Sequence, residues 1–485
     1  MNKLKDCLLV AVITTFVFYI GPQLAAASGH QKAQDIHKME QKIETLEKRI
    51  QDLEKGQMHN TEDLEILNDD MVEIEKKTLM DKINLGAEIR VRGDWFSLED
   101  KLNDVDDKVS ITPSTRFRLN LGADVSDNLR FSGRLSILEN WGDNDIGRFN
   151  SLSNSRVRGD NSLKVERAYA DYFFDFMPVA LTIGRLPMAD GLPTDFREDT
   201  PRKSTYPALA YDTEADGVAL SFDLSKLIPL PNPALRFIYT KQVQDDDSEI
   251  YRNDTLEAAD LSVYAAQIET GLPGMFADTL FIFNYVNVPK LSAPSSASLS
   301  ALLGAPVTTV SLPDDLGDLT KYTFFVQSKR FLGSWIDWFA GYSITKIKPS
   351  GTAANYLING VIPYSLGYLS DDNLPDRKGH CYHVGARVNL PIEALNYPKF
   401  GVEYNKGSKY WLGTTFAAED PLDKLAVKGN AWDFYYIQPV DKYFTIRAGY
   451  TVLNVDWTAP GLFYGDVQDA DQDITNTYVL LDIKF

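Results

Sequence analysis

The stretch TNTYVLLDIKF, residues 475–485, alternates between two kinds of side chain. One set of alternate positions is mostly apolar: Thr477, Val479, Leu481, Ile483 and Phe485. The positions between them carry the polar groups, with two larger side chains among them: Asn476, Asp482, Lys484, Tyr478 and Leu480. Because neighbouring side chains of a strand point to opposite faces, this period of two predicts a β-strand with one apolar face and one largely polar face.

The same alternation recurs from residue 83 onward in about sixteen segments of roughly ten residues, an even number with the length of membrane-spanning strands. The segments lie near 83–96, 113–125, 128–138, 163–175, 178–187, 213–224, 234–243, 259–269, 278–289, 318–331, 335–347, 379–390, 398–406, 429–439, 442–453 and 474–485. Short and long connections alternate between them, and the long ones include 139–162, 188–212, 290–317, 348–378, 407–428 and 454–473. The pattern predicts an all-β transmembrane antiparallel β-barrel over residues 81–485, with its short turns in the periplasm and its long loops outside.

Two further segments precede the predicted barrel. Residues 1–27 begin with positive charge, continue with a short apolar run over 8–20 and end in Ala-Ala-Ala, which predicts a cleaved signal peptide. Residues 28–80 repeat apolar side chains at steps of three and four, which predicts an α-helical coiled coil in the periplasm. Gln57 and Asn60 place polar groups in its seam, either as a register device or as a local break. The apolar seam is Ile36, Met39, Ile43, Leu46, Ile50, Leu53, Leu64, Leu67, Met71 and Ile74.

The composition limits the classes of function. The 485 residues have a formal net charge of −19, and such an acidic chain is not expected to bind nucleic acid. The mean hydropathy of −0.24 suits a soluble protein, but a barrel with a polar interior has the same composition. Of the two cysteines, Cys7 lies in the predicted signal peptide and Cys381 remains, so no intramolecular disulfide is expected.

The order of signal peptide, coil and barrel resembles a little-characterised group of proteobacterial outer-membrane proteins with a general-porin-type barrel. The strand end TIGRLP at residues 182–187, with the loop after it, is the stretch most like that group. The resemblance implies an outer-membrane location, contact with lipid and lipopolysaccharide, a final Phe that takes part in assembly, and a homotrimer. Alternation of Ile and Leu in the first half of the seam favours a dimer instead, so the trimer depends on the resemblance.

The resemblance also implies that the third long loop folds inward and narrows the pore. In this loop, residues 188–212, the candidate constriction residues are Asp190, Asp195, Glu198, Asp199 and Arg202. The first strands place a candidate pore-lining basic wall on their predicted interior faces: Arg90, Arg92, Arg116, Arg118, Arg130 and Arg134. An arginine wall opposite an acidic loop would set a transverse field across the pore. The alternatives are an ordinary acidic surface loop, and arginines that merely stabilise the wall by pairing with Glu88, Glu166 or Asp171.

These features predict a passive outer-membrane porin for small hydrophilic solutes or ions. Two alternatives remain: an anchor whose coil contacts the cell wall or a periplasmic partner, and a substrate-specific channel. No enzyme is predicted, because the barrel's only histidines, His380 and His383, have no catalytic motif around them. No cofactor or metal is predicted either, since these histidines and Cys381 lack converging ligands, and the spaced aspartates of residues 469–473 lack the Gly and Glu of a calcium loop.

Overall fold

The computed structural model describes residues 42, 44, 45, 48, 82–141, 163–243, 260–273, 278–415, 420–458 and 463–485. The chain divides into two compact units, Met1–Lys82 and Ile83–Phe485. Residues 42, 44, 45 and 48 are helical, and Lys48 and Glu44 form an ion pair of 3.6 Å one helical turn apart. The predicted signal peptide and every residue of the predicted seam lie outside the described residues, so the coiled coil stays a prediction.

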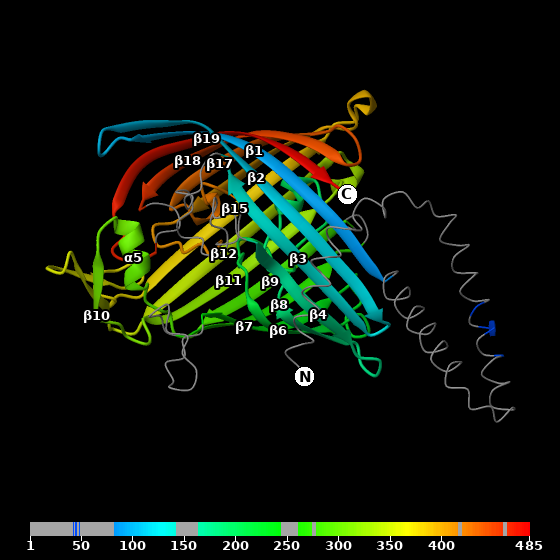
Figure 1. Cartoon of the computed structure of the whole chain (residues 1–485), viewed down its shortest axis with the longest axis horizontal. Coiled ribbons are helices and arrows are strands. Elements are labelled where there is room, and N and C mark those ends of the chain that lie inside the picture. The colour runs from blue at the N-terminus through cyan, green and yellow to red at the C-terminus, as the bar shows by residue number, and fades with distance from the viewer. Residues whose placement is uncertain are drawn as a thin grey trace, which may run out of the picture. The chain divides into compact units, whose positions relative to one another are not determined.

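The second unit is a closed antiparallel β-barrel (Figure 1). Sixteen strands form it in the part of the chain that the structure describes. They are β1 (Ile83–Asp100), β2 (Val105–Ser126), β3 (Leu129–Asn140), β4 (Lys164–Phe173), β5 (Val179–Arg185), β6 (Asp216–Asp223), β7 (Ala234–Val243), β8 (Leu261–Gly271), β9 (Thr279–Val288), β11 (Gly317–Ser328), β12 (Ile336–Pro349), β15 (Arg377–Asn389), β16 (Lys399–Gly407), β17 (Gly429–Pro439), β18 (Phe444–Trp457) and β19 (Asp469–Lys484). Each strand pairs with the next along this series, and β1 pairs with β19 to close the barrel. The predicted porin-like fold is confirmed.

The opening alternation of the sequence becomes the two faces of β19. Tyr478, Leu480 and Asp482 are buried inside the barrel, while Leu481 and Ile483 are 38% and 43% exposed on its outer face. The register places Asp482 opposite Arg90 of β1, so the closing pair of strands brings two interior charges together. A period of two therefore sorts the side chains of this strand as predicted.

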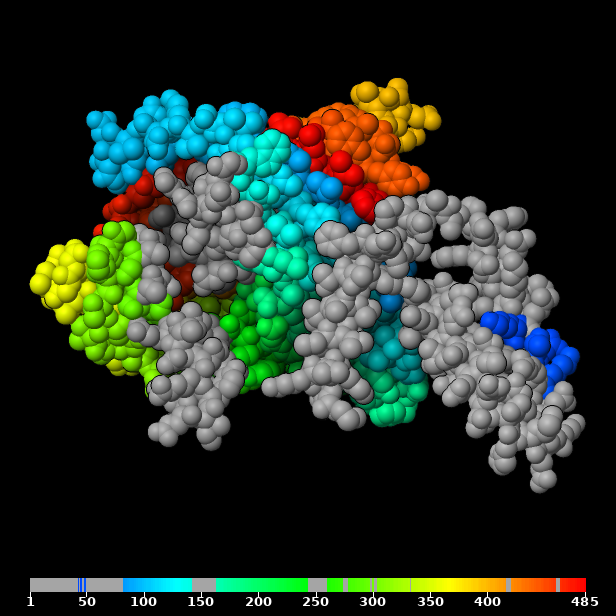
Figure 2. All heavy atoms as spheres, in the orientation of Figure 1, coloured from blue at the N-terminus to red at the C-terminus, as the bar shows by residue number. Residues whose placement is uncertain are grey.

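Two long connections contain helices and strands that the sequence does not predict. The long connections after β9 and β12 contain α5 (Ser296–Leu303) and a three-stranded sheet of β10 (Val307–Ser311), β13 (Ala354–Ile358) and β14 (Ile362–Leu366). Figures 1 and 2 show α5 and β10 together at one end of the barrel. Apolar packing joins this sheet to the barrel through buried side chains such as Leu316, Tyr356 and Tyr368. Among the described residues, no helix is long and apolar enough to cross a membrane.

Candidate functional site

The connection between β5 and β6 folds into the barrel interior. We call residues 186–215 the first inward loop, and most of its side chains are buried. It contains the short helix α4 (Thr194–Glu198). Two segments of its backbone lie against each other, since Leu192 and Pro207 form an isolated β-bridge. A Cβ at position 191 would lie 2.5 Å from the amide nitrogen of Ala208. Glycine at position 191 is thus required by space, and the loop is a compact body.

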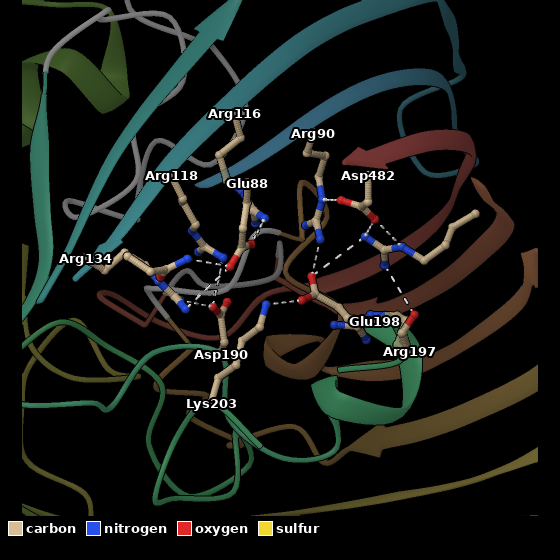
Figure 3. A network of polar contacts seen from close by, with 12 residues as sticks. Glu88, Arg90, Arg116, Arg118, Arg134, Asp190, Arg197, Glu198, Lys203 and Asp482 are labelled. Atoms are coloured by element: carbon tan, nitrogen blue, oxygen red, sulfur yellow. Dashed lines mark hydrogen bonds and ion pairs between the residues drawn. The ribbon is translucent and has the colours of Figure 1, made fainter. Parts of the chain in front are cut away.

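Charge pairs attach one side of the first inward loop to the strands around the barrel closure (Figure 3). Arg90 donates from Nη2 to Oε1 of Glu198 over 2.7 Å and from Nε to Oδ1 of Asp482 over 2.6 Å. Arg447 of β18 pairs with the same Asp482 at 2.8 Å. Lys203 pairs with the second oxygen of Glu198 at 2.5 Å. Glu198 is therefore the carboxylate through which α4 contacts the strands around the barrel closure.

A second group of charges lies farther along the same wall. Asp190 pairs with Arg118 at 3.2 Å and with Arg134 at 3.3 Å. Arg118 also donates to Glu166 over 2.9 Å. Arg116, another arginine of the predicted wall, pairs with Glu88 at 3.2 Å. All of these side chains are buried, and burial is tolerated because each charge has an opposite charge in reach.

The opposite side of the first inward loop makes contacts of a different kind. Phe196, 1% exposed, packs in an apolar cluster with Ile282, Phe325 and Phe339. Its backbone oxygen accepts a hydrogen bond from Arg387 over 2.7 Å. Polar contacts surround this cluster, namely Asp195 with Gln327 at 2.8 Å and with Lys329 at 3.3 Å, and Asp199 with Arg387 at 3.1 Å and with Lys399. The loop is thus held from both sides of the lumen.

The predicted wall and loop residues divide into two groups. In the first group, three wall arginines pair with carboxylates of the first inward loop: Arg90, Arg118 and Arg134. Arg116 belongs with them and pairs with Glu88 of the wall. The loop carboxylates described above contact the wall in return. Arg92 pairs with Asp94 of its own strand, and Arg202 pairs with Glu269 at 3.0 Å. Arg130 lies apart at the short-turn end, 58% exposed and paired with Asp124. The pairings with Glu88 and Glu166 that the sequence offered as an alternative are also present.

A second connection also turns into the barrel, and the sequence analysis did not find it. Between β16 and β17, residues 408–415 and 420–428 form what we call the second inward loop, whereas the sequence predicts an external loop over 407–428. Lys424, 3% exposed, pairs with Glu403 at 2.8 Å and with Asp433. Glu403 also pairs with Arg197 of α4 at 3.1 Å. The sequence does contain a signal for this loop. Glu403 and Asp433 stand at interior positions of β16 and β17, and buried carboxylates require cationic partners from another part of the chain.

A polar cavity of about 50 Å³ remains between the two inward loops and the strands β1 and β17–β19. Its charged lining consists of Arg90, Arg92, Arg197, Lys424, Arg447, Asp190, Glu198, Asp212, Asp420 and Asp433. A smaller cavity of about 20 Å³ adjoins it and shares Thr194, Arg197, Asp212, Asp420 and Lys424. Volumes of this size hold a few water molecules or an ion.

Residues 106–482 match a family described as "Protein of unknown function (DUF3373)". The chain belongs to this family. No curated protein matches it. It is similar to solved porins: OprB of Pseudomonas putida in a high-pH structure, with 11% identity, TM-score 0.47 and coverage of 85% of this chain and 96% of that one; an anion-selective porin from Comamonas acidovorans, with 11%, 0.46, 83% and 99%; and OmpF of Salmonella typhi in complex with daunomycin, with 11%, 0.44, 83% and 97%.

The surroundings of the loop carboxylates in this DUF3373 barrel determine their charge. Burial by itself would raise the pKa of Glu198, but Arg90, Lys203 and Arg447 hold that pKa well below its usual range. Burial raises the pKa of Asp195, and its cationic neighbour Lys329 does not offset this. The two carboxylates of α4 therefore differ in acidity, with Glu198 the more firmly ionised.

Asp423 of the second inward loop behaves differently. Burial raises its pKa to about 7, and the nearby carboxylates of Asp420 and Asp212 add to the rise. Thr415, which donates a hydrogen bond of 2.5 Å to Asp423, and Lys428 act in the opposite direction. This carboxyl group of the DUF3373 barrel thus changes its charge near neutral pH.

Within the described ranges, no group of three His, Cys, Asp or Glu side chains is placed to hold an ion. His383 lies beside Glu403 at 3.3 Å, and Cys381 is buried. The described lining of the larger cavity consists of fixed charges of both signs around a small polar space.

Proposed function

We propose that the protein is an outer-membrane channel through which small hydrophilic solutes or ions diffuse passively, without catalysis. The observation that carries the proposal is the polar cavity of about 50 Å³ inside a closed barrel, lined by charges of both signs. Ion channels select solutes with such rings and walls of charge at close quarters. The pathway would run between the first inward loop and the strands around the barrel closure.

The outer surface supports a place in the membrane. Large apolar side chains are exposed on the outward faces of the strands, including Phe237 at 49%, Phe324 at 46% and Ile183 at 53%. The short-turn end carries a further exposed set: Phe176, Leu227, Trp335, Tyr397, Tyr443 and Phe485. Such an apolar band with aromatic residues at its rim suits a lipid bilayer and its interface. We also propose that the barrel contacts lipopolysaccharide and forms a homotrimer, as its resemblance to porins implies.

The charges would act on a solute by orienting it. Arg90, Arg92 and Arg447 approach the cavity from β1 and β18, whereas Asp190 and Asp212 approach it from the first inward loop. Opposite charges on facing sides of a narrow, low-dielectric passage produce a transverse field. A dipolar solute or a hydrated ion aligns in this field, while an apolar solute gains nothing from it.

A substrate-specific channel is the second candidate, and the size of the cavity favours it. About 50 Å³ is far below the several hundred ångströms cubed of an ordinary ligand pocket, so only ions or very small solutes fit without movement of a loop. A general diffusion pore would show no saturation with solute, whereas a specific channel would saturate.

The test is the single-channel conductance of the refolded protein in a planar bilayer, with the reversal potential in a salt gradient. We expect discrete open steps and a reversal potential that shifts in Arg90→Gln, because this variant removes a positive charge from the cavity lining. Lys108→Gln, which removes an exposed charge on β2, is the control and should leave the reversal potential unchanged. A folded barrel that never opens would refute the open channel.

A further inference from the structure

The second inward loop is held inside the barrel by a set of contacts that the wall itself provides. We propose that it is a second constriction element, built into the lumen, which together with the first inward loop sets the cross-section of the passage. The proposal rests on the proposed channel function and concerns the part of the site that decides which solutes fit. Four kinds of contact support it: space made by glycines, an anchoring tryptophan, hydrogen bonds between the two loops, and buried ion pairs of Lys424.

Glycines make room in the wall where the loop backbone passes. A Cβ at Gly379 of β15 would lie 2.1 Å from the carbonyl oxygen of Tyr410. One at Gly407 of β16 would lie 2.1 Å from the carbonyl oxygen of Val427. Real Cβ atoms do not approach backbone that closely, so any other residue at these positions would push the loop away from the wall. Two neighbouring strands thus carry glycine at the points where the loop contacts them.

Trp411 anchors the same segment. Its side chain is 1% exposed and clusters with Leu209 of the first inward loop and Cys381 of β15. Its Nε1 donates to the carbonyl oxygen of Leu425 over 2.8 Å, which joins the two described halves of the loop. The ammonium group of Lys321 lies 4.5 Å from the centre of the ring. Burial of so large an aromatic side chain is among the strongest single contributions available to a loop.

Hydrogen bonds connect the second inward loop to the first. The backbone N–H of Asp212 donates to the carbonyl oxygen of Thr414 over 2.8 Å. The hydroxyl group of Thr414 donates to the carbonyl oxygen of Ala210 over 3.1 Å and accepts from Nζ of Lys321 over 3.0 Å. The two loops therefore form one continuous body across the lumen, and a wall lysine is attached where they meet.

Buried charge holds the far end of the loop. Lys424 pairs with Glu403 and Asp433, both of which are buried on the wall. Moving the loop outward would take the ammonium group of Lys424 away from both buried carboxylates, and removing a cation from a buried pair is costly. Lys424 and Asp420 line both polar cavities, so the loop reaches the space through which a solute would pass. Wall residues therefore hold the second inward loop in its inward position through each of these contacts.

The experiment removes the loop and measures the pore. Gly407 and Gly429 face each other in the register of β16 and β17, so a turn of about four residues can replace residues 408–428 and join the two strands. In planar bilayers, we expect the single-channel conductance to rise by about twofold or more, because the passage widens. Neutral polymers of increasing size should also enter the shortened variant at sizes that the full chain excludes. Trp411→Ala in the full chain should shift both readouts in the same direction.

Controls and outcomes separate this inference from the channel function. Heat-modified electrophoretic mobility reports whether each variant is folded, and Trp335→Ala, at a side chain 61% exposed at the short-turn end, controls for loss of a tryptophan. If the full chain conducts and both loop variants conduct identically with the same polymer cut-off, the second constriction is refuted while the channel stands. If the full chain is silent and the shortened variant conducts, the loop closes the passage and the constriction is supported. Silence of all folded proteins refutes both.

Discussion

The two inward loops occupy the same lumen but are held in different ways. The first is attached by ion pairs on one side, through Glu198 and Asp190, and by the apolar contact of Phe196 on the other. The second depends on space left by glycines, on Trp411 and on one lysine between two wall carboxylates. A loop is thus directed inward as much by the absence of side chains at two wall positions, Gly379 and Gly407, as by the side chains that the loop carries.

Breaking the apolar attachment of the first inward loop should have the largest effect. Phe196→Ala removes a side chain that is 1% exposed among Ile282, Phe325 and Phe339, so we expect the free energy of unfolding to fall by about 4 kcal/mol. Denaturant unfolding of the refolded protein in detergent measures it. Phe176→Ala, at a side chain 80% exposed, is the matched control and should change little. Equal effects of the two variants would show that Phe196 is not an anchor.

Breaking the charged attachment comes next. Glu198→Gln leaves Lys203 without its carboxylate and removes one partner of Arg90, so we expect a loss of about 3 kcal/mol in the free energy of unfolding. The variant should also make the reversal potential more favourable to anions, because a negative charge leaves the cavity lining. Glu99→Gln changes an exposed carboxylate of β1 and should alter neither quantity.

A change of pH should distinguish the second loop from the first. Because burial raises the pKa of Asp423 from 3.8 to about 7, the unfolded chain loses this proton first as the pH rises, and the folded protein is destabilised across that window. The wild-type protein should therefore lose stability as the pH rises from about 4 to about 7, relative to Asp423→Asn, which has no such proton to lose. Parallel stability profiles of the two proteins would contradict this assignment. Glu198 of the first loop should not contribute in this range, since its pKa lies well below its usual value and it stays ionised.

The smallest effect is expected at Arg130, which the sequence placed in the basic wall. It is 58% exposed and pairs only at the surface with Asp124, so Arg130→Ala should change the free energy of unfolding by less than about 1 kcal/mol. Conductance should stay the same. If Arg130→Ala shifted the reversal potential as much as Arg90→Gln does, Arg130 would have to line the pore.

Much of the site could be predicted because charge and periodicity are local properties. The interior positions of Arg90, Arg116, Arg118 and Arg134 follow from alternation along their strands, since a charge on the lipid face would be costly. Their partners could not be predicted, because Asp190 and Glu198 come from a loop far away in the sequence. Arg130 shares the interior face of Arg134 but lies at the end of β3, and its height along the barrel is not encoded in a period of two.

The sequence alone determined the number and sidedness of the strands, because backbone pairing in a closed barrel imposes a period of two that can be read without knowing any partner. The resemblance to porins singled out the third long loop, and the sequence showed that this loop is rich in charged residues. Only the tertiary structure decided that the connection after β16 turns inward. That course depends on Gly379 and Gly407, which lie at the same end of two neighbouring strands, and on the contact of Trp411 with Leu209 and Cys381. Such a fit depends on contacts between residues distant in sequence, and no local pattern encodes it.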